Sequence, residues 1–328
     1  MVWKWLLWAV VWLGLAALLA AGAVTLLLVQ PVWQAQPERV ALRVDPERLE
    51  RHVRMLAEEF VPRNYAHPEN LDRVAAYIGE QFAAAGAAVS EQVYTADGRT
   101  YRNVIARFGP ATEERLVVGA HYDTDGEQPG ADDNASGVAG LLELARLLQG
   151  EALPLRVELV GYTLEEMPYA GTPYMGSAVH ARALREAGVP VRLMISLEML
   201  GYFRDEPGSQ RYPSPLLRLF YPDRGDFIAV VGRFLRDWQV RPVKRAMRGA
   251  TPLPVYSINA PADLPGIAWS DHGSFWAEGY DALMITDTAF YRNPHYHTVH
   301  DLPHTLDYRR MAYAVQATHA ALLAIAHR

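Results

Sequence analysis

Residues 116–149 read LVVGAHYDTDGEQPGADDNASGVAGLLELARLLQ, and residues 156–162 read RVELVGY. Leu116 to His121 forms a short β-rich run, and Arg156 to Tyr162 forms another. Between them, Ser136 to Gln149 is a helical segment that follows a polar cluster of the N-cap type. A strand, a helix and a second strand in this order predict two strands of a parallel sheet that is covered by the helix.

The alternation of strands and helices extends over most of the chain. Two helices are predicted before the first strand, at Asp45–Phe60 and Asn70–Ala85, because both have helical apolar spacing and begin at residues that suit the N-cap. Pro46 suits the first helical position. Ser177–Ala187 is predicted to be helical, and the Pro/Gly-rich stretch Arg204–Gly225 to be an inserted loop. The other predicted strands are Ala88–Tyr94, Asn103–Phe108, Leu193–Leu197 and Ala282–Ile285. We therefore expect an α/β fold, a single domain with a mixed, mostly parallel central sheet flanked by helices.

The N-terminus departs from this pattern. Trp5 to Val29 is an apolar run with one weakly polar member, and Lys4 is the only charge before it. At ~1.5 Å per residue, a helix of this length spans the ~30 Å hydrocarbon core of a bilayer. We expect a transmembrane anchor at 1–30, a stalk at 31–44 and one large domain at 45–328.

Two further expectations concern this segment. The lone Lys4 favours a cytoplasmic N-terminus, which predicts a single-pass membrane protein with its large domain (45–328) in the periplasm or outside the cell. The alternative is a cleaved signal peptide, because Ala20-Ala21-Gly22-Ala23 offers small residues near a cleavage point.

The composition excludes several classes of function. The chain of 328 residues has no cysteine, which rules out thiol catalysis, cysteine-ligated zinc and iron–sulfur clusters. Its net charge of -6 gives no basic footprint, so nucleic acid is not an expected partner. The sequence contains neither a Gly-x-Ser-x-Gly elbow nor a His-Glu-x-x-His motif, which argues against a serine hydrolase of that kind and a metalloprotease of that type.

Acidic and imidazole side chains follow three of the predicted strands. His121 and Asp123 end one strand, Glu165 and Glu166 follow another, and Glu198 ends a third. In open α/β sheets, ligands bind beyond the carboxyl ends of the strands. So many acidic groups in one place would repel one another unless a cation held them together, which predicts a metal site.

Each of these pieces alone also has a simpler explanation. His121 fits a hydrogen-bonded turn, Asp132-Asp133-Asn134 fits an N-cap cluster, and Glu165-Glu166 fits a solvated acidic turn. Glu198 is more specific, because a carboxylate in an apolar strand needs a partner. His295, His297, His300 and His304 share one segment, and spacing alone does not choose between His295 and His297 as a ligand.

Taken in order, six motifs resemble the co-catalytic dizinc exopeptidases, a family that contains bacterial leucyl aminopeptidases, glutamate carboxypeptidase and the glutaminyl cyclases. The resemblance covers the chain from about Asp45 to the C-terminus. The motifs are Gly119-Ala120-His121-Tyr122-Asp123, Gly130 to Gly137, Glu165-Glu166, Leu197-Glu198-Met199, Ser270-Asp271-His272 and Tyr296 to Asp301.

The resemblance implies two zinc ions and a role for each matching residue. Asp133 would bridge the metals, with His121 and Glu198 on one ion and Glu166 and His297 on the other. Glu165 would be the general base, and the Asp133–Asn134 peptide bond would be cis. Asp123 would orient His121 through the second nitrogen of its ring. Asp271 and Tyr296 would support the site or contact substrate. Glu198 departs from the family pattern, because many members have aspartate there.

The implied function is metal-dependent removal of residues from the N-terminus of peptides. A glutaminyl cyclase with one zinc is the first alternative. In that subfamily, however, tryptophan precedes the last histidine ligand, whereas this sequence has Tyr296 at that position. A non-catalytic peptidase-like ectodomain and an amidohydrolase acting on acylated amino acids are the others. Side-chain preference and oligomeric state stay open at this point.

Overall fold

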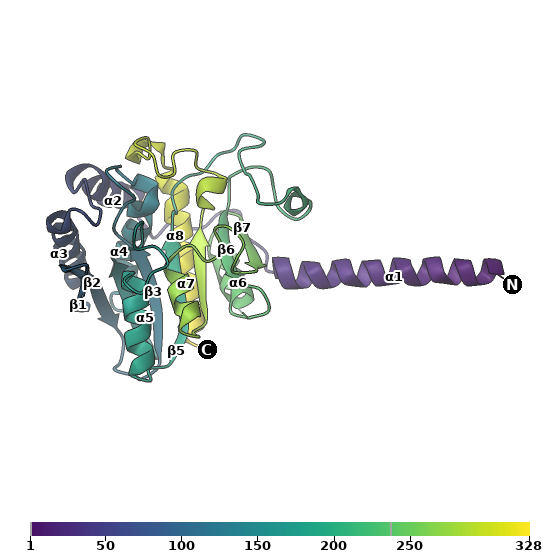
Figure 1. Ribbon diagram of the computed structural model, residues 1–328, viewed down its shortest axis with the longest axis horizontal. Coiled ribbons are helices and arrows are strands. Elements are labelled where there is room, and N and C mark those ends of the chain that lie inside the picture. Colours follow the sequence, from purple (N-terminus) through teal and green to yellow (C-terminus); the bar gives the residue numbers. More distant parts are fainter. Residues whose placement is uncertain (1, 237) are drawn as a thin grey trace.

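The computed structural model describes residues 2–236 and 238–328. A long N-terminal helix, α1 (Val2–Val29), projects from an α/β domain (Figure 1). The strands are β1 (Ala88–Ala96), β2 (Arg99–Phe108), β3 (Arg115–His121), β4 (Arg156–Tyr162), β5 (Val191–Glu198), β6 (Ile228–Arg233), β7 (Val255–Ala260) and β8 (Ala282–Thr286). The other helices are α2 (Pro46–Arg54), α3 (Pro68–Ala84), α4 (Gly137–Leu148), α5 (Gly176–Glu186), α6 (Val240–Ala250), α7 (Asp271–Ala277) and α8 (Tyr308–Ala326). Short helical turns are η1 (Met55–Glu59), η2 (Ala131–Ser136), η3 (Pro215–Leu219), η4 (Ala289–Tyr291) and η5 (Pro303–Thr305).

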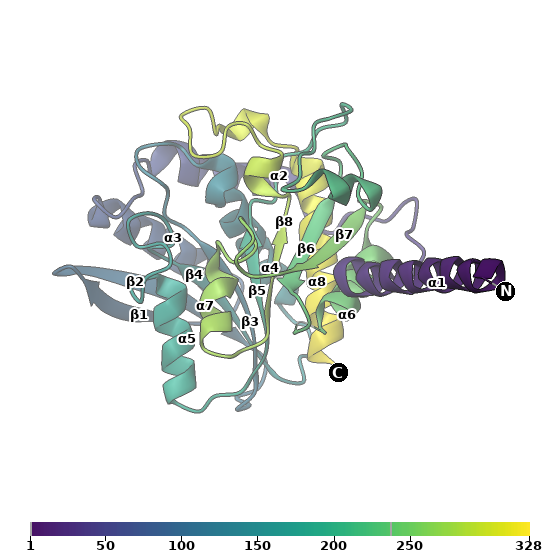
Figure 2. The same ribbon diagram turned by 45° about the vertical axis from the view of Figure 1, so that its right-hand side comes forward.

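The strands form one sheet in the order β1-β2-β4-β3-β5-β8-β6-β7. β4, β3, β5 and β8 run parallel in its centre, and β7 runs parallel to β6. β1 and β2 are antiparallel to their neighbours at one side, and β6 is antiparallel to β8. The expected mixed, mostly parallel sheet is thus confirmed, and Figure 2 shows its strands between helices on both faces.

Alternating residues of the central strands face two different cores. On β3, Leu116 and Val118 belong to a large apolar cluster that includes residues of α2, α3, α4, α6 and α8. Val117, between them, faces a smaller cluster with Phe275 and Trp276 of α7. Burial of the strands on both faces explains why they appear as near-continuous apolar runs in the sequence.

The first helix begins as predicted, because the Asp45 side chain accepts a hydrogen bond from the Glu47 amide and Pro46 takes the first helical position. The second begins at Pro68 instead of Asn70, because the Asn70 side chain donates to the Pro62 carbonyl (2.8 Å) instead of capping the helix. The predicted inserted loop at 204–225 is irregular apart from the turn η3.

The N-terminal helix is exposed along most of its length. Trp3–Val29 is long and apolar enough to cross a membrane, and none of its most apolar window is buried in the protein. The same length and composition also fit a signal sequence. The helix contacts the domain at β7, where its last residue, Val29, accepts a hydrogen bond from Ser257.

Candidate active site

Three acidic and imidazole side chains meet at the carboxyl ends of β3 and β5. His121 is the last residue of β3, Glu198 is the last of β5, and Asp133 lies in η2. The Nε2 atom of His121 is 3.3 Å from Asp133 Oδ1 and 3.4 Å from Glu198 Oε2. Ser270 donates a hydrogen bond to Glu198 Oε2 (2.7 Å) and fixes that carboxylate. All these side chains are buried.

The second oxygen of Asp133 faces a second group of ligand-type side chains. Asp133 Oδ2 is 3.1 Å from His297 Nε2, and the same nitrogen is 3.3 Å from Glu166 Oε2. On the far side of the ring, His297 Nδ1 is 3.1 Å from Asp125 Oδ2. Tyr296 stacks on the His297 ring with centroids 3.8 Å apart. Asp133 therefore lies between two clusters and offers one oxygen to each.

His295, the alternative ligand, lies elsewhere. Its ring makes edge contacts with Tyr202 and His300, with centroids 6.0 and 6.2 Å apart. Of the two histidines that sequence spacing could not separate, His297 is the one brought to the carboxylates.

Asp123 holds the two consecutive glutamates rather than the imidazole. Its carboxylate oxygens accept hydrogen bonds from the Glu165 and Glu166 amides, both at 3.1 Å. His121 Nδ1 lies closer to the Asp123 carbonyl oxygen (3.2 Å) than to its carboxylate (3.7 Å). The expected contact between Asp123 and His121 is thus made mainly through the backbone. Glu165 Oε2 is 3.9 Å from His121 Nε2, so its carboxylate lies at the edge of the cluster.

The loop that carries Asp133 is held by hydrogen bonds from two sides. The Asp301 carboxylate accepts from the Asp132 and Asp133 amides at 2.9–3.1 Å. The Asn134 side chain donates to the Leu197 carbonyl and accepts from the Met199 amide at 2.8 and 3.0 Å, which ties η2 to the end of β5. The Asp133–Asn134 bond is cis, as the resemblance predicts.

Glycine is required where this loop meets the sheet. A Cβ on Gly137 would lie 2.3 Å from Asn134 Oδ1 and 2.6 Å from the Leu197 carbonyl oxygen. A larger residue at 137 would therefore push η2 away from β5.

Arg63 is a buried residue of the site that the sequence did not single out. Its guanidinium donates to the carbonyls of Leu56 and Tyr122 at 3.0 Å, and also to those of Pro129 and Gly130. Burial lowers its pKa to about 10, against the opposing influence of nearby carboxylates, so it stays charged at neutral pH. One side chain thus joins the first turn of η1, the loop after β3 and the residues just before η2.

Replacing Arg63 by methionine should destabilise the domain. Several buried carbonyls would lose their donor, and each unsatisfied group costs about 1–3 kcal/mol, so we expect a loss of at least about 2 kcal/mol. The midpoint of urea unfolding measures it. The control is Arg73→Met, since Arg73 is exposed and donates to Asn70, and its effect should stay within about 0.5 kcal/mol. Equal shifts in both variants would contradict this role for Arg63.

The two remaining predicted residues border the cluster. Asp271 begins α7, is fully buried, and neither of its carboxyl oxygens has a hydrogen-bond partner among the described residues. Burial raises its pKa to about 7. Tyr296 stacks on His297 and is half-buried, and burial raises the pKa of its hydroxyl well above the usual value.

Burial and the crowding of carboxylates around two imidazoles shift the pKa values of the cluster. Burial raises the pKa of Glu165 well above its usual value and that of Glu166 to about 7. Burial disfavours protonated imidazole, yet Asp133 and Glu166 outweigh it and raise the pKa of His297 to about 10. For His121, burial is likewise outweighed, by Glu198 and Glu165, and its pKa rises well above the usual value.

The residues fit metal ions well. Asp133 Oδ1 and His297 Nε2 are buried without a hydrogen-bond partner among the described residues. Two ligands at ~2.0–2.2 Å from one tetrahedral zinc lie about 3.3–3.6 Å apart, close to the imidazole–carboxylate spacings of this cluster. The sets His121, Asp133, Glu198 and Asp125, Glu166, His297 each offer ligand atoms within 4.8 Å of one another.

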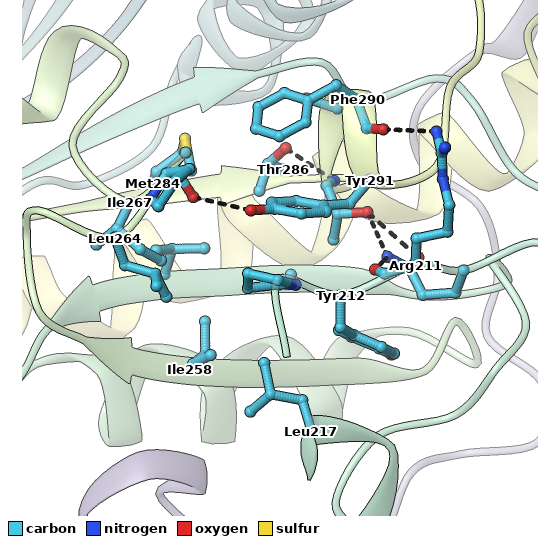
Figure 3. A pocket seen from close by; sticks show the side chains of 18 of the residues that line it. Arg211, Tyr212, Leu217, Ile258, Leu264, Ile267, Met284, Thr286, Phe290 and Tyr291 are labelled. Carbon is cyan, nitrogen blue, oxygen red and sulfur yellow. Dashed lines mark hydrogen bonds between the residues drawn. The ribbon is translucent and has the colours of Figure 1, made fainter. Parts of the chain in front are cut away.

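Two hollows meet at this cluster. One is a cavity of about 110 Å³ with mainly apolar and aromatic walls, which reaches Glu198, Trp269 and Tyr296. Figure 3 shows Ile258, Met284 and Phe290 among the side chains that surround it. The other is a broad cleft of about 790 Å³, which also contacts Trp269 and Tyr296 and is bordered by Glu165, Glu166 and His297. The carboxylates thus lie where a deep apolar pocket opens into a wider, more polar cleft.

The sequence is similar to several known proteins. It is 49% identical to the uncharacterized protein YfbL of Escherichia coli (strain K12) over 278 residues, which are 82% of this chain and 85% of that one. It is 27% identical to a probable leucine aminopeptidase of Arthroderma otae over 212 residues, 62% of this chain. The chain covers only 51% of the length of that relative.

Solved structures share the fold at lower identity. BSAP, a zinc aminopeptidase from Bacillus subtilis, superposes with a TM-score of 0.66 at 15% identity, over 86% of this chain and 95% of that one. The glutaminyl cyclase of Fimbriiglobus ruber superposes with a TM-score of 0.65 at 19% identity, over 88% and 98%.

The family itself follows from a sequence match. The model of peptidase family M28 matches residues 103–322, which include His121, Asp133, Glu165, Glu166, Glu198 and His297. The match supports a peptidase-type function, and the relatives and neighbours support a metallopeptidase. This chain belongs to peptidase family M28.

Proposed function

We propose that this protein is a membrane-anchored zinc aminopeptidase that prefers peptides with a large apolar residue at the N-terminus. The observation that carries the proposal is the position of Asp133, which offers one carboxylate oxygen to His121 and the other to His297 at 3.3 and 3.1 Å. Such an arrangement suits a pair of metal ions that share one carboxylate.

In this proposal, His121, Asp133 and Glu198 hold one zinc ion, and Asp133, Glu166 and His297 hold the other. Bound zinc would supply acidity to a water molecule and polarise the carbonyl of the scissile bond. Asp125, beside Nδ1 of His297, orients that ring and increases its basicity. Ser270 orients the Glu198 carboxylate by donating a hydrogen bond to its Oε2.

Glu165 acts as the general base. Its carboxylate is buried at the edge of the cluster and borders the broad cleft, so a water on the cleft side lies within its reach. This carboxylate would accept a proton from the attacking water and return it to the leaving amine. Asp123 positions it by binding the Glu165 amide.

The charge of the site favours a free amino terminus over a carboxylate. Five carboxylates, Asp125, Asp133, Glu165, Glu166 and Glu198, gather within a few ångströms, and two zinc ions would bring only four positive charges. No surplus positive charge is left to bind a C-terminal carboxylate. An N-terminal ammonium group is attracted instead.

The apolar cavity accounts for the side-chain preference. It opens beside Glu198, and its walls include Ile258, Met284 and Phe290 (Figure 3). The broad cleft on the other side of Trp269 and Tyr296 has room for the rest of the peptide.

Filling the cavity should change selectivity more than catalysis. Ala229 lines it from β6 and is buried. Ala229→Phe should lower kcat/KM for leucyl and phenylalanyl p-nitroanilides by about 10–200-fold, the effect expected from removing room for one or more carbons. The alanyl substrate serves as the internal control and should be nearly unaffected. An equal loss on all three substrates would place the pocket of the cleaved residue elsewhere.

A substrate panel tests the function itself. We expect hydrolysis of leucyl p-nitroanilide and of peptides with a free N-terminus, and none of the same peptides after N-acetylation. Cleavage of the acetylated peptides would indicate an amidohydrolase of acylated amino acids. Formation of pyroglutamate from N-terminal glutamine peptides without hydrolysis would indicate a glutaminyl cyclase.

The location is part of the proposal. We propose that α1 stays attached and crosses the membrane once, with the catalytic domain outside the cytoplasm. The domain should be digested by protease added to intact spheroplasts, and the mature protein should retain α1. A mature N-terminus after Ala23 would instead identify a cleaved signal peptide.

A further inference from the structure

The point where α1 leaves the catalytic domain is fixed by buried hydrogen bonds. The carbonyl oxygen of Val29, the last residue of the helix, accepts from Ser257 Oγ (2.8 Å) and from Lys244 Nζ (2.9 Å). Lys244 also donates to the Gln30 carbonyl at 3.3 Å, and its side chain is 3% exposed. Ser257 lies on β7 and Lys244 on α6, so the helix is docked to the domain and does not hang from a free linker. The surface around this exit must therefore face whatever the helix enters.

Large apolar side chains are exposed around the exit. Leu235 and Trp238, in the loop between β6 and α6, are 56% and 69% exposed and line a shallow depression together with Leu27 and Gln30 of the N-terminal segment. Trp33, four residues beyond α1, is 87% exposed. This part of the apolar surface is thus continuous with the end of the helix.

The turn η3 lies on the same side of the molecule. Leu216 and Leu219 are 70% and 77% exposed. Two residues after η3, the Tyr221 hydroxyl donates to the carbonyl of Ser257, the residue whose side chain binds Val29. In both Figure 1 and Figure 2, the green loop that carries η3 projects beside the domain-proximal end of α1.

The same region is strongly basic in an acidic protein. Residues 211–248 contain nine Arg or Lys and three Asp, a net charge of +6, whereas the whole chain has -6. Arg218 and Arg236 are exposed directly beside Leu219 and Leu235 in the sequence. Arg241 and Arg245 of α6 are exposed as well. Apolar and tryptophan side chains mixed with arginine are typical of surfaces that lie in the headgroup layer of anionic membranes.

We propose that Trp33, Leu216, Leu219, Leu235 and Trp238, which we call the exit face, rest in the headgroup layer of the membrane that α1 crosses and contact anionic lipid. The inference depends on the proposed anchor and adds a second, peripheral contact to it. Leu217, between the two exposed leucines of η3, lines the apolar cavity beside the active site. Lipid contact and one wall of the substrate pocket therefore share a single turn.

The absence of cysteine makes a clean test available. Single cysteines at Leu216, Leu219 and Leu235 are labelled with a nitrobenzoxadiazole fluorophore in the full chain, which is reconstituted into vesicles of phosphatidylcholine and phosphatidylglycerol with spin-labelled lipids. The matched control is Val93→Cys, because Val93 is 56% exposed like Leu235 but lies on β1, at the opposite edge of the sheet. Leu15→Cys, within α1, reports on the anchor alone.

We expect lipid-borne spin labels to quench the fluorophore at 216, 219 and 235 and at 15, but not at 93. Quenching at 15 alone would support the anchor but overturn the proposal that the exit face contacts lipid. Absence of quenching at 15 would overturn the anchor, and the exit face with it. Blue-shifted emission at 216 or 235 without quenching would assign the face to a protein partner, such as a second copy of this chain, and would also overturn the inference.

The contribution of the exposed arginines to lipid contact is tested in the same assay. Replacing Arg218, Arg236, Arg241 and Arg245 by glutamine should reduce quenching at 219 in vesicles that contain phosphatidylglycerol. Quenching equal to that of the parent protein would overturn the assignment of these arginines to anionic lipid.

Discussion

Glu165→Gln should lower kcat by about 10²–10⁴-fold while the zinc content stays near that of the parent protein. Glutamine keeps the size of the side chain, but it cannot accept a proton from the attacking water. The Glu165 amide would still bind Asp123, so the loop after β4 should keep its position. Turnover on leucyl p-nitroanilide and zinc by mass spectrometry are measured on the same sample.

Glu166→Gln is the matched control, since it makes the same chemical change one residue away. Glu166 Oε2 lies 3.3 Å from His297 Nε2, in the second ligand cluster. A neutral amide is a weaker ligand than a carboxylate, so this variant should lose zinc, and added zinc should restore part of its activity. Glu165→Gln should not respond to added zinc. Near-normal turnover in Glu165→Gln would contradict its role as the base.

Asp133→Asn should have the largest effect on metal binding, because among the described residues Asp133 is the one carboxylate within 4.0 Å of both His121 Nε2 and His297 Nε2, at 3.3 and 3.1 Å. We expect the affinity for both zinc ions to fall by well over ~100-fold. A residue that only supports a ligand typically changes metal affinity by ~10–100-fold. Activity should fall to background in zinc-limited buffer. Zinc titration monitored by calorimetry measures the loss.

Asp125→Asn provides the graded comparison. Asp125 contacts the far nitrogen of His297 at 3.1 Å and has no contact with His121. Its replacement should weaken one zinc site by ~10–100-fold and leave the other unchanged. If Asp133→Asn affected only one site as well, Asp133 would not bridge the two ions.

The strands that build the site were predictable because both of their faces are buried. Leu116 to His121 and Arg156 to Tyr162 appear in the sequence as short β-rich runs, and the structure has strands there with ends shifted by at most one residue. β6 and β7 were missed. β6 (Ile228–Arg233) directly follows the irregular loop at 204–225 and pairs antiparallel with β8, although β6, α6 and β7 continue the strand–helix–strand alternation of the domain.

The residues that support the site were less predictable than its ligands. His121, Glu198 and His297 belong to motifs whose types and order are informative. Arg63 lies between Pro62 and Asn64, a context typical of a solvated turn, yet it is buried and donates to carbonyls of Leu56 and of two segments that are distant in the sequence, at Tyr122 and Gly130. The role of Asp125 was likewise not predictable, because it depends on a contact with His297, which is far away in the sequence and close in space.

The most direct test of the two-zinc aminopeptidase is to strip the metal and return it stepwise. The full-length protein is depleted with a chelator, and leucyl p-nitroanilide hydrolysis is measured against bound zinc during titration. The account predicts no activity without zinc and full recovery as the second zinc binds to each chain. Hydrolysis that survives complete removal of the metal would contradict this prediction. A folded protein that binds two zinc ions but does not hydrolyse substrates with a free N-terminus would contradict it as well.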